Sequence, residues 1–176
     1  METQGLRLDK QEYFILLRPK DSTDAKLIKK LFENIDINDS ISPFVSNFER
    51  ILRDGGDSEL VNYLLDKGVN INGDGYNSLH AGVRSNNINL PTFQRIIDNS
   101  SDINARIDKI LRTPLLHALS IKHMYNYEKI ELLLQNGADI EISDYKGQNA
   151  YDYVNIKLKD DPILKKIYLD LLDKYK

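Results

Sequence analysis

Apolar residues recur along the chain in short stripes with helical spacing, and polar turns separate the stripes. Apolar pairs four residues apart place one stripe along a helix of about three turns. Four such stripes begin at Leu27, Leu60, Phe93 and Ile130. The pattern predicts amphipathic helices, each of which must bury one face against a neighbour.

A three-residue phrase follows each stripe at nearly constant spacing. It reads Asp-Ile-Asn at 36–38, Asn-Ile-Asn at 70–72, Asp-Ile-Asn at 102–104 and Asp-Ile-Glu at 139–141, at intervals of 34, 32 and 37 residues. A repeat of this length is typical of a solenoid, whose units carry too little apolar surface to fold alone and therefore stack.

A second phrase marks the start of another helix in each unit. Its clearest form is Thr-Pro-Leu-Leu-His-Ala at 113–118, where Thr113 can cap the helix and Pro114 fits its first position. Weaker forms start at Ser42, Asn77 and Asn149, so the four starts, Thr113 included, follow one another at intervals of 35, 36 and 36 residues. Each unit is therefore predicted to hold two helices and an extended turn.

Helix ends are marked by a few residue types. Gly68 and Gly137 follow two of the stripes and suit the left-handed residue that closes a helix. Asp161 and Pro162 predict the cap and first residue of a final helix. Its expected buried stripe consists of Ile163, Leu164, Ile167, Leu171 and Leu172.

The two phrases together resemble those of the ankyrin-repeat family, in which Thr-Pro-Leu-His-x-Ala opens the first helix and Leu-Leu-x-x-Gly-Ala-Asp-Ile-Asn closes the second. The best matches are residues 133–140 and 64–72, and the resemblance covers 24–155. It implies an all-α solenoid of about five stacked helix pairs with β-turn fingers. A composition rich in Ile, Lys and Asn suits a small bacterial or viral member of the family.

The expected organisation is a single domain over residues 1–176. Its units are an N-terminal cap repeat at 8–39, three repeats at 40–74, 75–109 and 110–145, and a C-terminal cap repeat at 146–176.

Composition narrows the class of protein. With 41% apolar and 29% charged residues and a net charge of -3, the 176-residue chain fits a globular domain and lacks the basic surface that nucleic acid requires. The sequence has no run of about 18 apolar residues, so it predicts no membrane-spanning helix. The N-terminus lacks a signal-peptide pattern. The absence of cysteine excludes disulfides and thiolate zinc sites. We expect a cytoplasmic monomer, or a protein of the host cytoplasm if it is viral or an effector.

Candidate chemistry is sparse. The histidines are His80, His117 and His123, and no two have the i, i+4 spacing of a zinc-binding helix. His80 holds the family's capping position, which favours a structural hydrogen bond. No Gly-x-Ser-x-Gly sequence occurs. No catalytic residue, cofactor or metal is therefore predicted, and an enzyme with an unrecognised site remains the alternative.

The resemblance also implies where a partner would bind, namely on the turn tips and the exposed side of each first helix. The candidate partner-binding residues are Asp39, Glu49, Arg50, Asp74, Tyr76, Arg84, Ile107, Lys109, Ile110, His117, Tyr145 and Lys146. Ile107 and Ile110 stand in a turn that is usually polar, so they either pack between tips or contact a partner.

Charge gives one further indication. Residues 33–74 carry nine acidic and three basic side chains, which favours a basic partner or serves only solubility. The expected function is a non-catalytic module that binds a protein on its concave face. It would act as an inhibitor, including an immunity protein that occludes a toxin, or as a host-interaction factor.

Overall fold

The computed structural model of the chain describes residues 26, 28–30, 33, 38, 47–72, 78–106, 108–121 and 126–176. In this part every regular element is a helix, which confirms the all-α prediction. The helices form four consecutive pairs: α3 (Asn47–Asp54) with α4 (Ser58–Asp66), α5 (Ser78–Arg84) with α6 (Leu90–Asp98), α7 (Pro114–Ser120) with α8 (Tyr127–Gln135), and α9 (Ala150–Lys157) with α10 (Pro162–Lys174). A short 3₁₀ helix, η1 (Asp108–Ile110), precedes α7.

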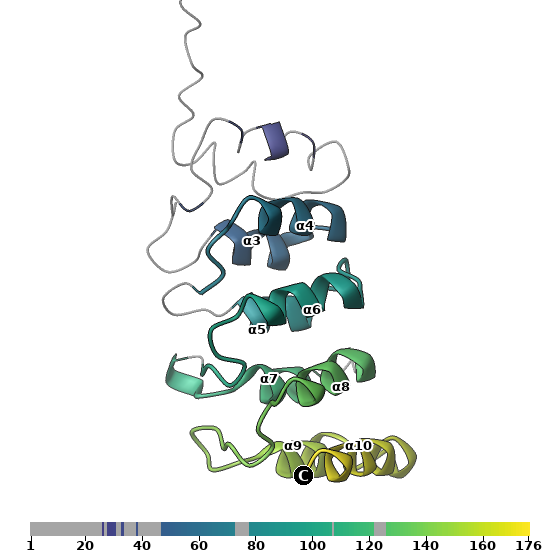
Figure 1. Cartoon of the computed structure of the whole chain (residues 1–176). Helices are drawn as coiled ribbons and strands as arrows, with labels where there is room; N and C mark the ends of the chain where they lie inside the picture. The colour runs from purple at the N-terminus through teal and green to yellow at the C-terminus, as the bar shows by residue number, and fades with distance from the viewer. Residues whose placement is uncertain are drawn as a thin grey trace, which may run out of the picture.

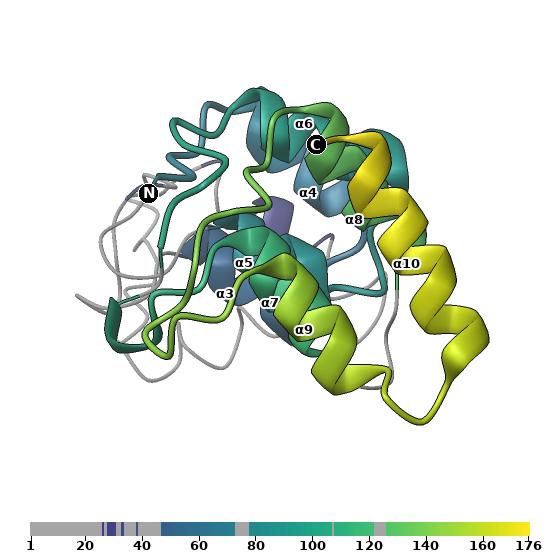
Figure 2. The same ribbon diagram turned by 90° about the horizontal axis from the view of Figure 1, so that it is seen from below.

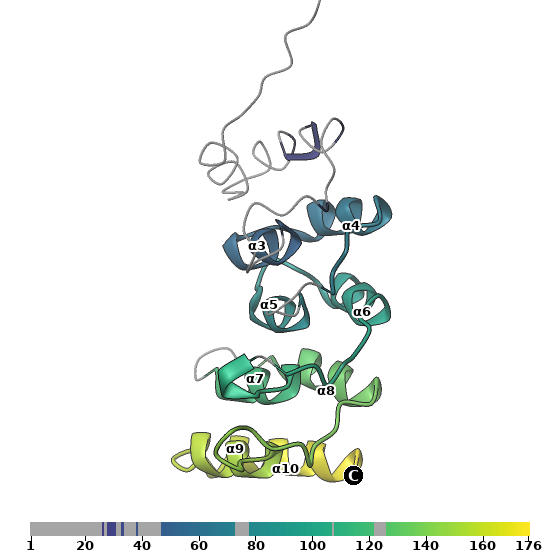
Figure 3. The ribbon, with the colours of Figure 1, turned by 90° about the vertical axis from the view of Figure 1, so that its left-hand side faces the viewer.

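The four pairs stack on one another in order along the chain (Figure 1). The first helices, α3, α5, α7 and α9, form one column, and the second helices α4, α6, α8 and α10 form the other (Figure 3). Each helix contacts its partner in the pair and the next helix in its own column. The predicted N-terminal cap repeat, 8–39, lies almost wholly outside the described residues, and the predicted unit boundaries stay predictions.

A continuous apolar core runs through the stack. Phe48, Leu79, Phe93, Leu115 and Ile130 come from five different helices, and each is fully buried. Since every level contributes side chains to this core, no described pair has a complete core of its own, as expected for a solenoid.

The helix ends follow the signals in the sequence. The Thr113 hydroxyl accepts a hydrogen bond from the Leu116 N–H at 3.2 Å, and the Asp161 carboxylate accepts one from the Leu164 N–H at 2.9 Å. Gly68 and Gly137 have φ angles of 76° and 89°. The caps predicted at Thr113 and Asp161 and the two closing glycines are confirmed, whereas Ser42 and Asn77 lie outside the described residues. Glycine adopts a positive φ at little cost.

Asparagine side chains join the turns of successive levels. The Asn72 side-chain oxygen accepts the Ser101 N–H at 2.9 Å, and the Asn104 side-chain oxygen accepts the Asp139 N–H at 2.9 Å. Asn38 makes the same contact with the Asn70 N–H at 2.6 Å. The repeated phrase therefore supplies both the apolar isoleucine of each unit and the polar link to the next one.

The final helix buries a different face from the one predicted. Tyr168, Leu171 and Leu172 are its buried residues, whereas Ile163 is 76% exposed and Ile167 is 44% exposed. The apolar residues of α10 occupy two adjacent faces, and only the face that meets α8 and α9 is covered. The predicted stripe is therefore wrong at Ile163 and Ile167.

Candidate partner-binding surface

The turn before α9 is a rigid finger built around Asp144. The carboxylate of Asp144 accepts hydrogen bonds from the N–H groups of Lys146 (2.8 Å) and Gln148 (3.1 Å), and from the Tyr153 hydroxyl (2.9 Å). Burial acts to raise the pKa of Asp144, but these hydrogen bonds outweigh burial and lower the pKa. The carboxylate thus stays ionised and fixes the backbone that presents Tyr145.

The preceding finger lies beside this turn. The Tyr145 N–H donates to the Ile110 carbonyl oxygen at 3.2 Å, so a backbone hydrogen bond joins the two tips. Both turns project to the same side of the stack, at the left of Figure 1, and they remain neighbours when the stack is seen from below in Figure 2. Figure 2 also shows that α8 and α10 lie on the opposite side of the molecule from this pair of tips.

Large apolar side chains are exposed at these tips. Tyr145 is 56% exposed, Ile110 is 39% exposed and Leu111 is 37% exposed. Exposed basic side chains beside them are those of Lys109 and Lys146, and the Lys146 ammonium lies 5.4 Å from the centre of the Tyr145 ring. We call the surface formed by Lys109, Ile110, Leu111, Tyr145 and Lys146 the tip surface.

Leu111 is the tip residue that sequence reasoning missed. Its φ angle is 53°, in the left-handed region, and it is the one described non-glycine residue with a positive φ. Leu111 stands two residues before the cap Thr113, as Gly147, with a φ of 75°, stands two before the cap Asn149. Aligning the two caps is the signal that would have found a leucine at a glycine position.

The structure brings four of the predicted partner-binding residues together: Lys109, Ile110, Tyr145 and Lys146. Arg84 is exposed but belongs to α5, one level away from η1 and α7. Four more predicted residues lie outside the described part of the chain: Asp39, Asp74, Tyr76 and Ile107.

The expectation that Glu49, Arg50 and His117 are exposed is wrong. They are 2%, 5% and 8% exposed. Arg50 turns along α3 toward Asp54, with its Nε 3.5 Å from the carboxylate. His117 turns into the stack because α7 packs against α5 on that side.

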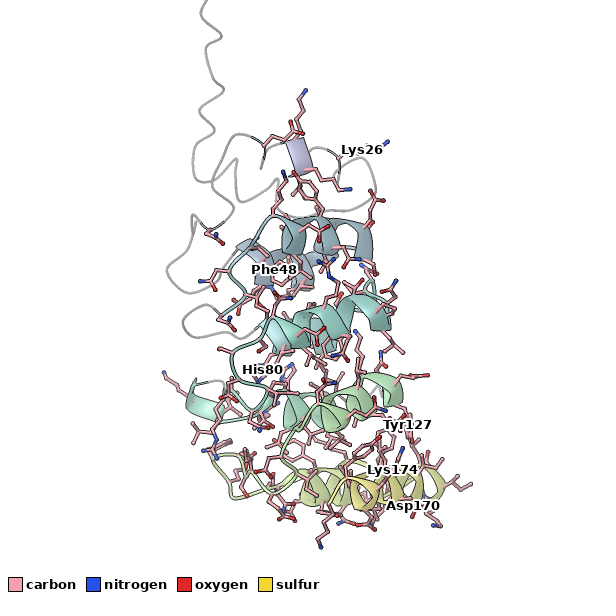
Figure 4. All side chains as sticks on the ribbon, in the orientation of Figure 1. Lys26, Phe48, His80, Tyr127, Asp170 and Lys174 are labelled. Carbon is pink, nitrogen blue, oxygen red and sulfur yellow. The ribbon has the colours of Figure 1, made fainter. Side chains whose placement is uncertain are left out.

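His80 and His117 form a buried pair between α5 and α7, at the level where Figure 4 labels His80. Their ring centres are 5.5 Å apart with an edge-to-face angle of 67°. The His80 Nε2 lies 2.9 Å from the Arg112 carbonyl oxygen, which confirms the predicted structural hydrogen bond.

Burial keeps both imidazoles neutral. It lowers the pKa of His80 to about 4 and, together with the positive charges near it, the pKa of His117 to about 3. Among the described residues no group of three or more His, Cys, Asp or Glu side chains is placed to hold a metal ion. The contacts of the pair are those of a packing element between two levels.

The acidic segment at 33–74 is partly neutralised within the fold. Asp66 on α4 pairs with Arg95 on α6, and Glu59 on α4 pairs with Lys29, and both basic side chains lie outside the segment. Neither pair lies on the tip surface. The negative charge counted in the sequence is therefore less available to a partner than its sum indicates.

A sequence model of the family described as ankyrin repeats (3 copies) matches residues 48–144. This match covers more than half of the chain, and the chain belongs to the ankyrin-repeat family. Ankyrin repeats generally mediate protein–protein interaction, and proteins built from them are typically non-catalytic adaptors.

The chain is also similar to two curated proteins, the Ankyrin repeat and SOCS box protein 6 of Homo sapiens and that of Pongo abelii. Each is 40% identical over 65 residues, which are 35% of this chain and 15% of the relative. The match therefore spans only a small part of the relatives. Of the described helices, none combines the length and the apolar character needed to cross a membrane.

Proposed function

We propose that this chain is a non-catalytic binding module that holds a protein partner on the tip surface. The single observation that carries the proposal is the joining of the two tips, where the Tyr145 N–H bonds to the Ile110 carbonyl and three large apolar side chains remain exposed. Exposed aromatic and aliphatic side chains on a rigid backbone are the usual anchors of protein interfaces.

The rigidity of the tips supports the proposal. The Asp144 carboxylate holds the backbone N–H groups of Lys146 and Gln148, just after Tyr145, and a tyrosine loses little conformational freedom when it is bound. A preorganised anchor lowers the entropic cost of association, which is a main determinant of affinity.

The two biological settings expected from the sequence need the same surface. An inhibitor or immunity-type protein would occlude the active site of its partner, whereas a host-interaction factor would engage a host regulator. The settings differ in the partner and not in the tip surface, so identification of the partner decides between them.

Site-specific photo-crosslinking tests the proposal in the native cell. A photoreactive phenylalanine analogue replaces Tyr145 in one version of the full chain and Asn155, exposed on α9, in a matched version. We expect a discrete protein adduct from position 145 that is absent from position 155. Adducts of the same mass and yield from both positions would contradict the tip surface as the binding site.

A further inference from the structure

We infer that the partner presents to the tip surface an acidic peptide segment, with one apolar or aromatic side chain set among carboxylates. This inference rests on the proposed function and adds the chemistry of the bound segment. It differs from the basic partner that the charge of residues 33–74 favours.

Leu111 holds a strained backbone conformation at the tip surface. A left-handed φ of 53° is unfavourable for any residue with a Cβ atom, and the equivalent turn uses Gly147. The side chain of Leu111 is 37% exposed, so packing within the chain recovers only part of this cost. Backbone strain of this kind is found mainly at binding and active sites, and here it holds a leucine outward beside Ile110.

The tip surface also has an apolar part. Ile110, Leu111 and Tyr145 come from two fingers joined by a backbone hydrogen bond, so together they form one apolar area. Such an area gains free energy by covering an apolar side chain of the partner. The Tyr145 ring also offers a flat face for an aromatic ring.

The positive charge of the tip surface favours a bound segment of negative charge. Lys109 and Lys146 are both exposed and lie on different fingers. In the sequence, Lys109 directly precedes Ile110, and Lys146 directly follows Tyr145. Asp144, next to Tyr145, is 7% exposed, and its carboxylate is committed to three hydrogen bonds. Two exposed ammonium groups near a carboxylate that is already hydrogen-bonded attract an acidic segment and repel a basic one.

The ion pairs elsewhere in the stack strengthen this choice. The described acidic side chains Asp54, Asp66 and Glu59 are each paired with a basic side chain of the chain itself. The two lysines of the tip surface, in contrast, have no carboxylate within ion-pair distance among the described residues.

Selection from a displayed library of random peptides tests the inference with the full chain as the target. Enriched peptides are synthesised, and their dissociation constants are measured by fluorescence polarisation. The test variant is the double substitution Lys109→Glu and Lys146→Glu. Its matched control, Lys157→Glu and Lys159→Glu, makes the same charge change at exposed positions at the end of α9.

We expect enriched peptides that carry acidic residues around one apolar or aromatic residue. Their affinity should fall by about tenfold or more in the test variant and in Leu111→Gly, and by less than about threefold in the control. Circular dichroism confirms that each variant is folded before its affinity is compared.

The remaining outcomes separate the two proposals. Peptides that depend on Tyr145 and Leu111 but are basic or uncharged would overturn the acidic partner and leave the tip surface in place. Peptides that bind all variants equally would overturn both the tip surface and the inference. Failure to enrich any peptide counts against the inference, since an accessible anchor of this kind should select ligands.

Discussion

The ammonium group of Lys129 donates a hydrogen bond to the Gly82 carbonyl oxygen at 2.8 Å, across 47 positions of the chain. It also donates to the Ser85 carbonyl oxygen at 2.6 Å. These carbonyls belong to the C-terminal end of α5, where helical carbonyls lack partners within the helix. Lys129 on α8 is 1% exposed and therefore acts as a buried cap for a helix in the neighbouring level.

Substitution Lys129→Met should destabilise the fold. Methionine keeps most of the packing above the Phe93 ring, which the ammonium group approaches to 5.2 Å, but it leaves two buried carbonyls without their donor. We expect the free energy of unfolding to fall by about 2–4 kcal/mol. Urea denaturation of the full chain measures this change, with Lys157→Met on the surface of α9 as the control. Equal stabilities of the two variants would show that the cap is dispensable.

The same lysine should make stability depend on alkaline pH. Burial lowers the pKa of Lys129 from 10.5 to about 8. Between these two values the unfolded chain binds more protons than the folded chain, so stability rises as pH increases from 8 to 10.5. The wild-type protein should gain stability over this interval relative to Lys129→Met, in which tyrosine ionisation still occurs. Parallel pH profiles of the two proteins would refute the shift.

The buried histidine pair should make the fold sensitive to mild acid. The pKa values of His80 and His117 are lowered from 6.5 to about 4 and about 3, so the unfolded state binds more protons below pH 6.5. Stability is complete above pH 6.5 and is lost as pH falls, by about 2 kcal/mol for each histidine at pH 5. Arg112 and Arg84 are the charged groups that act on His117 and oppose its protonation.

The variant His117→Phe isolates this effect because it keeps an aromatic ring against His80 and removes one titrating group. The quantity to compare is the difference between the urea midpoints at pH 7.5 and pH 5, and not the absolute stability of the variant. That difference should be smaller in the variant than in the wild type. An unchanged difference would assign the acid sensitivity to carboxylates instead.

The asparagine links should contribute to the stacking of levels. Asn104 accepts the Asp139 N–H and donates its side-chain N–H to the Gly137 carbonyl at 3.4 Å. We expect Asn104→Ala to lower the free energy of unfolding by about 1–2 kcal/mol, since two hydrogen bonds are lost at a partly buried site. Asn155→Ala, on the exposed side of α9, serves as the control. A similar loss in both variants would point to a general effect of asparagine and not to the link.

Leu111→Gly should stabilise the fold. The substitution relieves a left-handed φ of 53° and removes a side chain that is partly exposed. We expect a gain of about 1 kcal/mol, seen as a higher melting temperature in calorimetry. Ile110→Gly is the matched control because it removes a neighbouring exposed side chain from η1 without relieving a positive φ. A gain in the control but not in Leu111→Gly would disprove the strain.

Most of the fold could be predicted because the same local sequence signals occur in several repeats. Helix caps and closing glycines act on neighbouring residues in the sequence, so their roles can be predicted from the sequence. Examples are Thr113, Asp161, Gly68 and Gly137. Their positions alone fix helix starts and ends, and the constant spacing then implies stacking.

The buried face of α10 shows where such reasoning ends. Ile163 and Ile167 share one helix face and Leu164 and Tyr168 share the next, and the sequence does not say which face meets α8. The answer depends on the orientation of the last pair in the stack. The apolar pattern also does not mark Tyr168 as a core residue, although the centre of its ring lies 5.9 Å from that of Tyr127.

Only part of the candidate site could be predicted from the sequence. Lys109, Ile110, Tyr145 and Lys146 follow from their place in the turn, whereas the burial of His117 follows from a ring on another helix. Leu111 does not stand out in the apolar pattern, and in the sequence only the alignment of Thr113 with Asn149 marks it as a leucine where the other turn has Gly147.

The two hydrogen bonds from Lys129 to the end of α5 affect how the stack opens. A chain of units that touch only through apolar surfaces can fray from either end, one unit at a time. The hydrogen bonds from α8 to the end of α5 bind two adjacent levels at their centre, so these two levels should exchange their amide protons together. We therefore expect the middle of the described stack to open as one cooperative block, while the level of α9 and α10, which holds the Tyr145 finger through Tyr153, can loosen separately.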